Sequence, residues 1–169
     1  NLTGNSHSFV ATVLDVYGEI IDLFAKRFNK KKTFFSNLVG CEGACPTCSG
    51  SGRIVYNKKR DEEVSFECSE CKGSGFNISL KKYLIKGQSI FDLWEMTIDE
   101  AAIFFADNPK IVKSLKCAQK LLLGHLTLGQ NTSTLSGGEN IRIKLAKIHK
   151  TTADVCGIDE PFKGLSKTE

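Results

Sequence analysis

The sequence predicts an α+β fold that is mostly helical and carries one inserted β-hairpin module. Apolar residues repeat at steps of three and four through residues 9–28, as on one face of a helix. Residues 41–76 are instead rich in Cys, Gly and Ser, with two short strand-like segments at 53–56 and 64–67 and a polar link between them. We therefore expect four parts, which are a helical part, the hairpin module, a second helical region and a final strand with its loop: 1–40, 41–76, 77–150 and 151–169.

The elements after the hairpin module follow from local signals. They are a strand, two helices, and a last helix that starts at a Gly-Gly turn: 80–85, 97–106, 108–123, and 137–138 to about 150. Thr97 with Glu100 three residues later predicts a capping box at the start of the first helix. Either Asp107 or Asn108 is expected to cap the second, because Pro109 suits a first helical turn.

Composition limits the class of protein. The chain has 169 residues, which is enough for one domain and a small module, and its formal net charge is +4. That mildly basic balance permits a nucleic-acid partner without requiring one. No apolar run approaches the length of a membrane span, so we expect no membrane partner. The chain begins at Asn1 with no leader pattern, which favours an internal segment of a longer protein.

Two of the cysteine pairs form a repeat. Cys45 and Cys48 open one copy of Cys-x-x-Cys-x-Gly-x-Gly, and Cys68 and Cys71 open the other. Four thiolates at this spacing can close a tetrahedron around Zn²⁺, and such a closed site is structural rather than catalytic. Glycine tolerates the positive φ that lets backbone N–H groups face the sulfurs. An odd total of seven cysteines fits disulfides poorly, so we expect a reducing, cytoplasmic location.

The remaining cysteines and rings have plainer interpretations. Cys41 is either a fifth thiol near the metal or, as we favour, a spare one outside it. Cys117 and Cys156 are expected to be small buried apolar residues. Trp94 lies in an apolar pattern and is expected in the core, and His125 is expected to be a satisfied interior residue.

Two further motifs have the chemistry of a nucleotide site. Residues 135–139, Leu-Ser-Gly-Gly-Glu, open a helix, whose free N–H groups and dipole attract an anion. Alone, this turn is equally well explained as a simple helix cap. Residues 155–161 follow as a short apolar strand that ends in Asp159 and Glu160. Asp159 can hold Mg²⁺ and Glu160 can polarise an attacking water, and the order and spacing of turn, helix and strand are more specific than either motif.

These motifs resemble the signature motif and the Walker B strand of ATP-binding cassette ATPases, with a D-loop at 162–166. Residues 123–130 leading into 134–139, together with the cysteine repeat, are similar to the UvrA family of excinuclease proteins, and more to its second cassette than to its first. The resemblance implies part of an ATP-binding cassette domain and an ATP hydrolase that uses ATP and Mg²⁺. The residues that it implies at the nucleotide are Ser136, Gly137, Gly138 and Glu139 at the signature, Asp159 at the magnesium ion, and Glu160 as the catalytic residue.

The resemblance further implies a role in nucleotide excision repair. The expected partners are damaged double-stranded DNA, a second cassette or homodimer partner, and other excinuclease subunits. The sequence contains no phosphate-binding Gly-x-x-x-x-Gly-Lys-Ser/Thr loop, so we expect this piece alone to be inactive. The sequence also departs from the family pattern at four positions: Ile141, Gly157, Phe162 and Ser166. These departures favour a divergent paralogue or a weakened ATPase.

Basic residues of the hairpin are candidates for DNA contact: Arg53, Lys58, Lys59 and Arg60. Such a group can meet phosphates at a hairpin tip. The acidic residues at 61–63 beside it favour a solvated turn equally well.

Two other functions are compatible with parts of the sequence. A zinc-stabilised protein-binding module of the DnaJ type uses the same cysteine repeat, but it carries four copies and this chain has two. A UvrA-like cassette paralogue with a drug-resistance role would keep every nucleotide motif, so the sequence leaves that alternative open.

Overall fold

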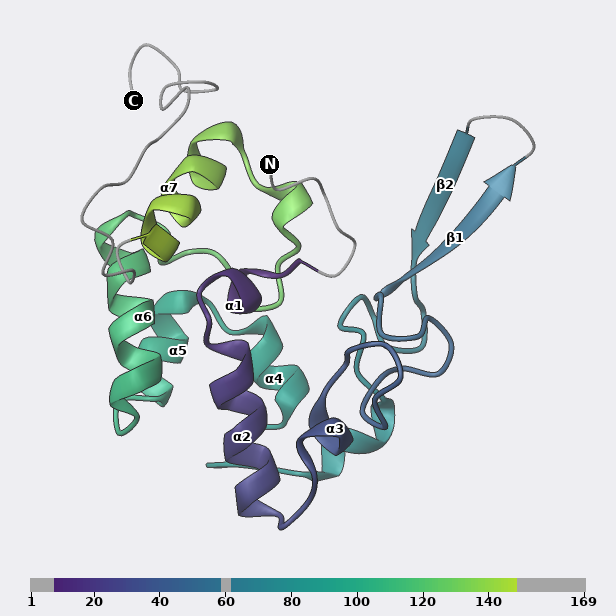
Figure 1. Ribbon diagram of the computed structural model, residues 1–169, viewed down its shortest axis with the longest axis horizontal. Helices are drawn as coiled ribbons and strands as arrows, with labels where there is room; N and C mark the ends of the chain where they lie inside the picture. The colour runs from purple at the N-terminus through teal and green to yellow at the C-terminus, as the bar shows by residue number, and fades with distance from the viewer. Residues whose placement is uncertain (1–7, 59–61, 149–169) are drawn as a thin grey trace. The chain divides into compact units, whose positions relative to one another are not determined.

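The structure, a computed structural model, describes residues 8–58 and 62–148 (Figure 1). The predicted strand at 155–161, with Cys156, Asp159 and Glu160, lies outside the described residues, as do Lys59 and Arg60. The described chain combines helices with one small antiparallel hairpin, as predicted. It divides into two compact units, Asn1–Glu19 with Glu95–Glu169, and Ile20–Trp94. The four sequence-based parts remain a prediction.

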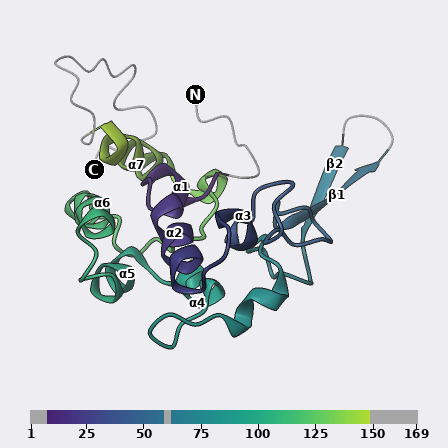
Figure 2. The ribbon, with the colours of Figure 1, turned by 60° about the horizontal axis from the view of Figure 1, so that its bottom comes forward.

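The first unit is helical. Its helices are α1 (Val10–Val13), α5 (Ile98–Phe104), α6 (Pro109–Lys120) and α7 (Gly137–Ile148), with a short 3₁₀ helix η2 (Thr132–Thr134) and the first residues of α2 (Tyr17–Arg27). α6 packs against both α5 and α7, and α1 packs against α7 (Figure 2). The buried side chains of this unit include Val10, Leu14, Ile98, Ile111, Leu115, Leu123, Leu128 and Ile143.

The single helix predicted over 9–28 is wrong, because the chain breaks between α1 and α2. The N–H groups of Val10 and Ala11 donate to the carbonyls of Gln130 and Leu128, both at 2.9 Å. Shortly after α1 comes a left-handed residue, Asp15 with φ 55°, and the Val16 N–H donates to the Ala11 carbonyl at 3.0 Å. That is the hydrogen-bond pattern of a helix end. The apolar stripe runs through the break because both helices bury it.

Caps fix the starts of α5 and α6. Thr97 Oγ1 accepts from the Glu100 N–H at 3.2 Å and Glu100 Oε2 accepts from the Thr97 N–H at 2.8 Å, which confirms the capping box. Asn108, rather than Asp107, caps α6, since its Oδ1 accepts from the N–H groups of Lys110 and Ile111. Pro109 is the first residue of that helix, as predicted.

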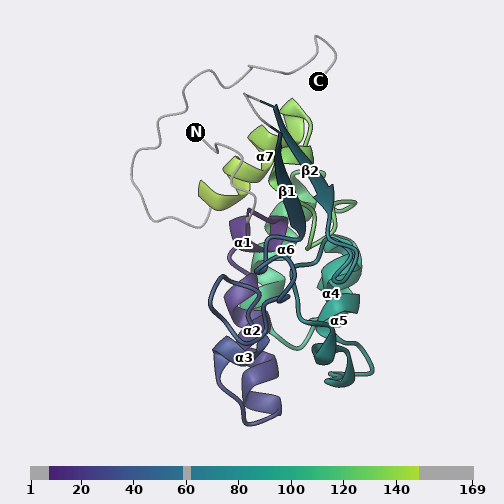
Figure 3. The ribbon, with the colours of Figure 1, turned by 90° about the vertical axis from the view of Figure 1, so that its right-hand side faces the viewer.

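The second unit surrounds the hairpin. It holds most of α2, then α3 (Lys32–Phe35), β1 (Arg53–Lys58), β2 (Glu62–Glu67), the 3₁₀ helix η1 (Ile78–Lys82) and most of α4 (Ile90–Glu95). β1 and β2 form an antiparallel two-stranded ribbon whose register runs from Arg53↔Glu67 to Lys58↔Glu62 (Figure 3). The strand predicted over 80–85 is wrong. Residues 78–82 form η1 instead, because Asn77 accepts the Ser79 N–H at 3.0 Å and starts a turn.

Trp94 lies in the core of this unit, as predicted. Its side chain is 4% exposed, and its ring meets the Phe76 ring edge-on at 5.0 Å between centroids. Phe76 is fully buried directly after the second cysteine loop. The stem of the hairpin module is therefore packed on α4. Within the described residues, no helix combines the length and apolar character that crossing a membrane requires.

Candidate metal centre and phosphate-facing turn

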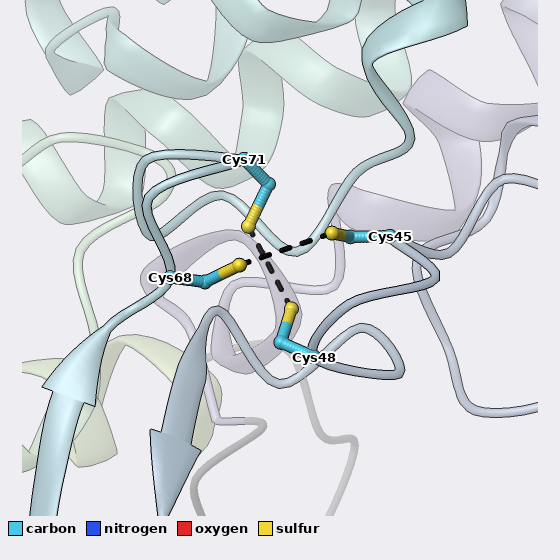
Figure 4. Close-up of side chains that lie close together, drawn as sticks. All are labelled: Cys45, Cys48, Cys68 and Cys71. Atoms are coloured by element: carbon cyan, nitrogen blue, oxygen red, sulfur yellow. Dashed lines mark hydrogen bonds between the residues drawn. The ribbon is translucent and has the colours of Figure 1, made fainter.

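The four cysteines of the repeat converge at the base of the hairpin. Their Sγ atoms all lie within 4.8 Å of one another, with Cys45 to Cys68 at 4.0 Å and Cys48 to Cys71 at 3.6 Å (Figure 4). A tetrahedral zinc site with Zn–S near 2.3 Å separates its sulfurs by roughly 3.8 Å. All four side chains are buried. The donor set and its spacing fit a tetrahedral thiolate site with no open position.

The loops after the two cysteine pairs have the same local geometry. The Gly52 N–H donates to Cys48 Sγ at 3.2 Å, and the Gly75 N–H donates to Cys71 Sγ at 3.3 Å. Both glycines have positive φ, 73° and 74°. These are the N–H···S contacts expected from the sequence. They stabilise negative charge on the sulfurs and so support a bound metal ion.

The two loops also bond each other directly. The Cys45 N–H donates to the Gly75 carbonyl at 2.8 Å, and the Cys68 N–H donates to the Gly52 carbonyl at 2.9 Å. A buried Asn37 holds the second loop to the segment before the module, because its Nδ2 donates to the Ser74 carbonyl at 2.9 Å. Asn37 comes from the segment before the module, and sequence reasoning missed it. A single polar residue in a loop gives no periodic signal of burial.

Burial and backbone hydrogen bonds act in opposite directions on the pKa of the Cys48, Cys68 and Cys71 thiols. Burial raises the pKa of the Cys48 and Cys71 thiols, although the Gly52 and Gly75 N–H groups oppose it. For Cys68 burial also acts to raise the pKa, but the backbone N–H groups of Cys71 and Glu70 outweigh it, and the pKa is lowered. Metal binding must therefore displace protons from buried thiols, so affinity for the metal is expected to increase with pH.

Two other cysteines lie outside the cluster. Cys41 is a half-buried free thiol, and it does not belong to the group of four. Cys117 is also half-buried rather than fully buried, and its Sγ donates to the Ala146 carbonyl at 3.9 Å. The expectation of a buried Cys117 is thus too strong, because α6 carries it beside α7 at the border of the core.

The turn before α7 has the geometry of a capping box. Ser136 Oγ accepts from the Glu139 N–H at 3.3 Å, and Glu139 Oε2 accepts from the Ser136 N–H at 2.8 Å. Ser136 and Gly137 are exposed and Gly138 is buried. In the part of the chain that the structure describes, the N–H groups of Gly137 and Gly138 have no hydrogen-bond acceptor. Both donors are at the positive end of the helix dipole.

His125 approaches this turn, contrary to the prediction of an interior residue. Its Nε2 lies 2.8 Å from Glu139 Oε1, and its side chain is 61% exposed against 18% for Glu139. The prediction failed because His125 lies in the turn between buried Leu123 and Leu126, and that turn faces α7. Glu139, expected at the nucleotide, thus serves here as a cap.

Hydrogen bonds keep Glu139 ionised. The His125 bond, followed by the Ser136 N–H, lowers the pKa of Glu139 against the opposing effect of burial. A carboxyl group whose folded-state pKa is lowered stabilises the fold above its ordinary pKa, and it loses that contribution as the pH falls through the lowered value. The capping box therefore persists to a more acidic pH than an unpaired glutamate would allow.

Among the candidate DNA-contact residues, Arg53 is the one whose side chain the structure describes. The Arg53 guanidinium lies across the ribbon, where Nε donates to Ser65 Oγ at 3.0 Å and Nη2 donates to the Ser65 carbonyl at 2.9 Å. Lys58 ends β1, and its side chain is outside the described part, like Lys59 and Arg60. Tyr56 and Phe66 are exposed on one face of the ribbon with their rings 6.0 Å apart.

A second group of basic residues forms where two distant segments meet. The Tyr83 ring packs against Phe28 and Phe34, with centroids 5.0 and 5.5 Å apart. This contact brings the end of η1 beside the basic run at 27–32. The cations lie over the rings at 5.3–5.6 Å and form what we call the Tyr83 basic cluster: Arg27, Lys30 and Lys82. Sequence reasoning missed the cluster because its halves are far apart along the chain.

No family model matches the chain. It is similar to the UvrABC system protein A of Helicobacter pylori (strain ATCC 700392 / 26695), with 41% identity over 164 residues, and to that of Streptococcus pyogenes serotype M1, with 38%. Each match covers 92% of this chain and 17% of the relative. In structure, it resembles UvrA2 from Deinococcus radiodurans with a TM-score of 0.76 and 33% identity, over 85% of this chain and 18% of that chain. The chain is homologous to one segment of UvrA.

The matched part of the chain includes both candidate sites. Because the sequence matches cover 92% of the chain, at most its outermost residues are left out, and both cysteine pairs and the turn at 135–139 are included. The chain spans 17% of the length of these UvrA relatives.

Proposed function

We propose that this chain is the segment of a UvrA-type, ATP-binding cassette ATPase that carries a structural zinc ion and the signature turn. The full-length protein would act in nucleotide excision repair in the cytoplasm, with other excinuclease subunits. The observation that carries the ATPase proposal is the pair of N–H groups at Gly137 and Gly138, which have no acceptor among the described residues and lie at the start of α7, next to the capping box of Ser136 and Glu139.

The proposed metal role is structural. Cys45, Cys48, Cys68 and Cys71 would hold Zn²⁺ as thiolates, with two sulfurs accepting N–H groups from the glycine loops. Four protein ligands leave no coordination position for a substrate. The ion would fix the base of the hairpin and take no part in a reaction.

The proposed nucleotide role follows from the turn. Backbone N–H groups at a helix start favour a phosphate, which would be the γ-phosphate of ATP held by a second cassette or a homodimer partner. By the family resemblance, Asp159 would hold Mg²⁺ and Glu160 would orient the attacking water in the segment's own cassette. Capping by Glu139 supports this role, because it occupies the Ser136 N–H and leaves those of the glycines available.

A charge placed in the turn tests the nucleotide role. In the full-length protein, Gly137→Asp is expected to lower ATP turnover at least about tenfold, because a carboxylate repels the phosphate in an electrostatically tuned site. The helix should form normally, since aspartate is favourable in a first turn. Steady-state hydrolysis and nucleotide-binding assays measure the two effects, and nucleotide binding at the phosphate loop should persist.

The matched control is Ser133→Asp, which adds the same charge at an exposed position of η2, four residues before Gly137. It should leave turnover within about twofold of the unmodified protein. Equal turnover in Gly137→Asp and the unmodified protein would show that the turn does not meet a phosphate.

We propose damaged double-stranded DNA as the second substrate, contacted through phosphates. Two basic groups are the candidates, the hairpin residues Lys58, Lys59 and Arg60, and the Tyr83 basic cluster. The cluster is supported by its geometry, since three exposed basic side chains lie over half-buried aromatic rings. Arg53 is the weakest candidate, because its guanidinium is already bound to Ser65.

Charge reversal tests the contribution of each basic group to DNA binding separately. In the full-length protein, Lys30→Glu with Lys82→Glu, and separately Lys58→Glu with Lys59→Glu and Arg60→Glu, should each weaken duplex binding about tenfold. The salt dependence should also flatten by about 0.9 in log–log slope for each phosphate that the variant no longer neutralises. Fluorescence anisotropy at several salt concentrations measures both quantities.

Lys144→Glu with Lys147→Glu on exposed positions of α7 is the control for net charge. The same loss of affinity in this control would attribute the effect to overall charge. A variant that keeps the original affinity and slope would assign its lysines to solvent.

A further inference from the structure

Glu139 connects the signature turn to a loop that the nucleotide motifs do not include. One carboxylate oxygen accepts the Ser136 N–H at 2.8 Å, and the other lies 2.8 Å from His125 Nε2. Each oxygen thus has its own partner. The Glu139 side chain is only 18% exposed, so its conformation is restricted on both sides.

We propose that His125 is a positioning residue that holds Glu139 on the Ser136 amide and so fixes the bend that presents Gly137 and Gly138 to a phosphate. The proposal rests on the proposed function, and it extends the nucleotide site to a residue outside the signature motif.

The loop that carries His125 is well anchored. Leu123 and Leu126 on either side of it are buried. The Leu126 carbonyl accepts the Ile98 N–H at 2.9 Å, and the Leu123 N–H donates to the Ala118 carbonyl at 3.1 Å. The imidazole is therefore exposed while its backbone is fixed between α5 and α6. An exposed ion pair between two mobile side chains contributes little to stability. The backbone that carries His125 is held in place, so its side chain loses less conformational freedom on pairing.

The chemistry of the pair keeps the bond intact near neutral pH. Because the pKa of Glu139 is lowered, its carboxylate only accepts hydrogen bonds, so His125 Nε2 must carry a proton. Both the imidazolium and the neutral tautomer protonated at Nε2 satisfy this requirement. Loss of His125 would leave one oxygen of Glu139 without its partner and allow the carboxylate to rotate away from Ser136.

The test uses the zinc-loaded full-length protein with two substitutions. His125→Phe keeps a ring of similar size but removes the donor, and His125→Gln keeps an N–H donor at the position of Nε2. We expect His125→Phe to raise KM for ATP about fivefold with kcat changed less than twofold, because the turn contacts a phosphate that is present in both the ground state and the transition state. His125→Gln should restore KM to within about twofold of the unmodified protein.

A second measurement needs no turnover. Hydrogen–deuterium exchange of the peptide that covers 133–140 reports on the Ser136 N–H. In the nucleotide-free protein, His125→Phe should accelerate this exchange several-fold and His125→Gln should not. Exchange and KM that are the same in all three proteins would overturn the proposal. An equal change in both variants would also overturn it, because ring bulk and not the hydrogen bond would then matter.

The two proposals can fail separately. If the unmodified full-length protein shows no ATP turnover while His125→Phe still accelerates exchange at Ser136, the nucleotide function fails and the positioning role of His125 stands. If turnover is normal and KM is unaffected by His125→Phe, the positioning role fails and the nucleotide function stands.

Discussion

Removal of the metal from the zinc-loaded protein is expected to unfold the cysteine-rich module while the helices of the other unit stay folded. The module has almost no apolar core of its own, since the buried cluster at its centre consists of the four cysteines with Ile54 packed against them. Phe76 is buried, but its ring packs against Trp94 outside the module, and Val55, Tyr56 and Phe66 are between 48% and 60% exposed. Zinc binding by small thiolate sites contributes about 10–16 kcal/mol, which here would be folding free energy.

Chelation followed by NMR measures this outcome. Signals from 41–76 should collapse to unfolded positions, whereas those of α5, α6 and α7 should remain. Cys71→Ser should bind no zinc by elemental analysis. Cys41→Ser is the matched control, because Cys41 is a cysteine of the same region outside the cluster, and it should retain one ion per chain. Spectra that chelation leaves unchanged would contradict the structural role of the metal.

The second large effect is expected from Gly52→Ala. A Cβ at this position would lie inside contact distance of the Gly73 carbonyl oxygen, which belongs to the opposite loop. The backbone of Gly52 also has φ +73°, which costs a side-chain-bearing residue about 1–2 kcal/mol. Because both atoms in the clash are held by backbone, the loops must separate, and we expect a further loss of about 1–3 kcal/mol.

Gly87→Ala is the control that isolates the clash. Gly87 has a similar φ of +78°, but a Cβ there would meet nothing within 4 Å. It should therefore show only the cost of the backbone conformation. Chemical denaturation of the zinc-loaded protein and its zinc affinity measure both variants. If the two alanines destabilise the protein equally, the close approach of the loops does not matter for stability.

The metal centre was predictable because its determinants are local. Each Cys-x-x-Cys-x-Gly-x-Gly copy encodes its own turn, and the N–H···S contacts at Gly52 and Gly75 follow from that spacing. The capping box at Thr97 is local in the same way. The convergence of the two copies needed only a hairpin of the right length between them.

The other features depend on contacts between distant segments. The break at Asp15 follows from hydrogen bonds to residues 128–130, which no pattern within 9–28 can reveal. Residues 80–85 have apolar residues compatible with a strand, but the Asn77 turn and the buried Leu80 select a 3₁₀ helix. His125 and Glu139 are 14 positions apart, and the pairing depends on how α6 and α7 pack.

The reciprocal bonds between the cysteine loops set how this ribbon can vary. The Cys45 N–H bonds the Gly75 carbonyl and the Cys68 N–H bonds the Gly52 carbonyl. All of these contacts are made by residues before or after the strands, which pair from Arg53↔Glu67 onward. Adding or deleting matched residue pairs beyond that point would change the reach of the arm by about 3.4 Å for each pair while leaving the anchor untouched. The length of the β1–β2 ribbon can therefore change in evolution without altering the stability of the cysteine loops at its base.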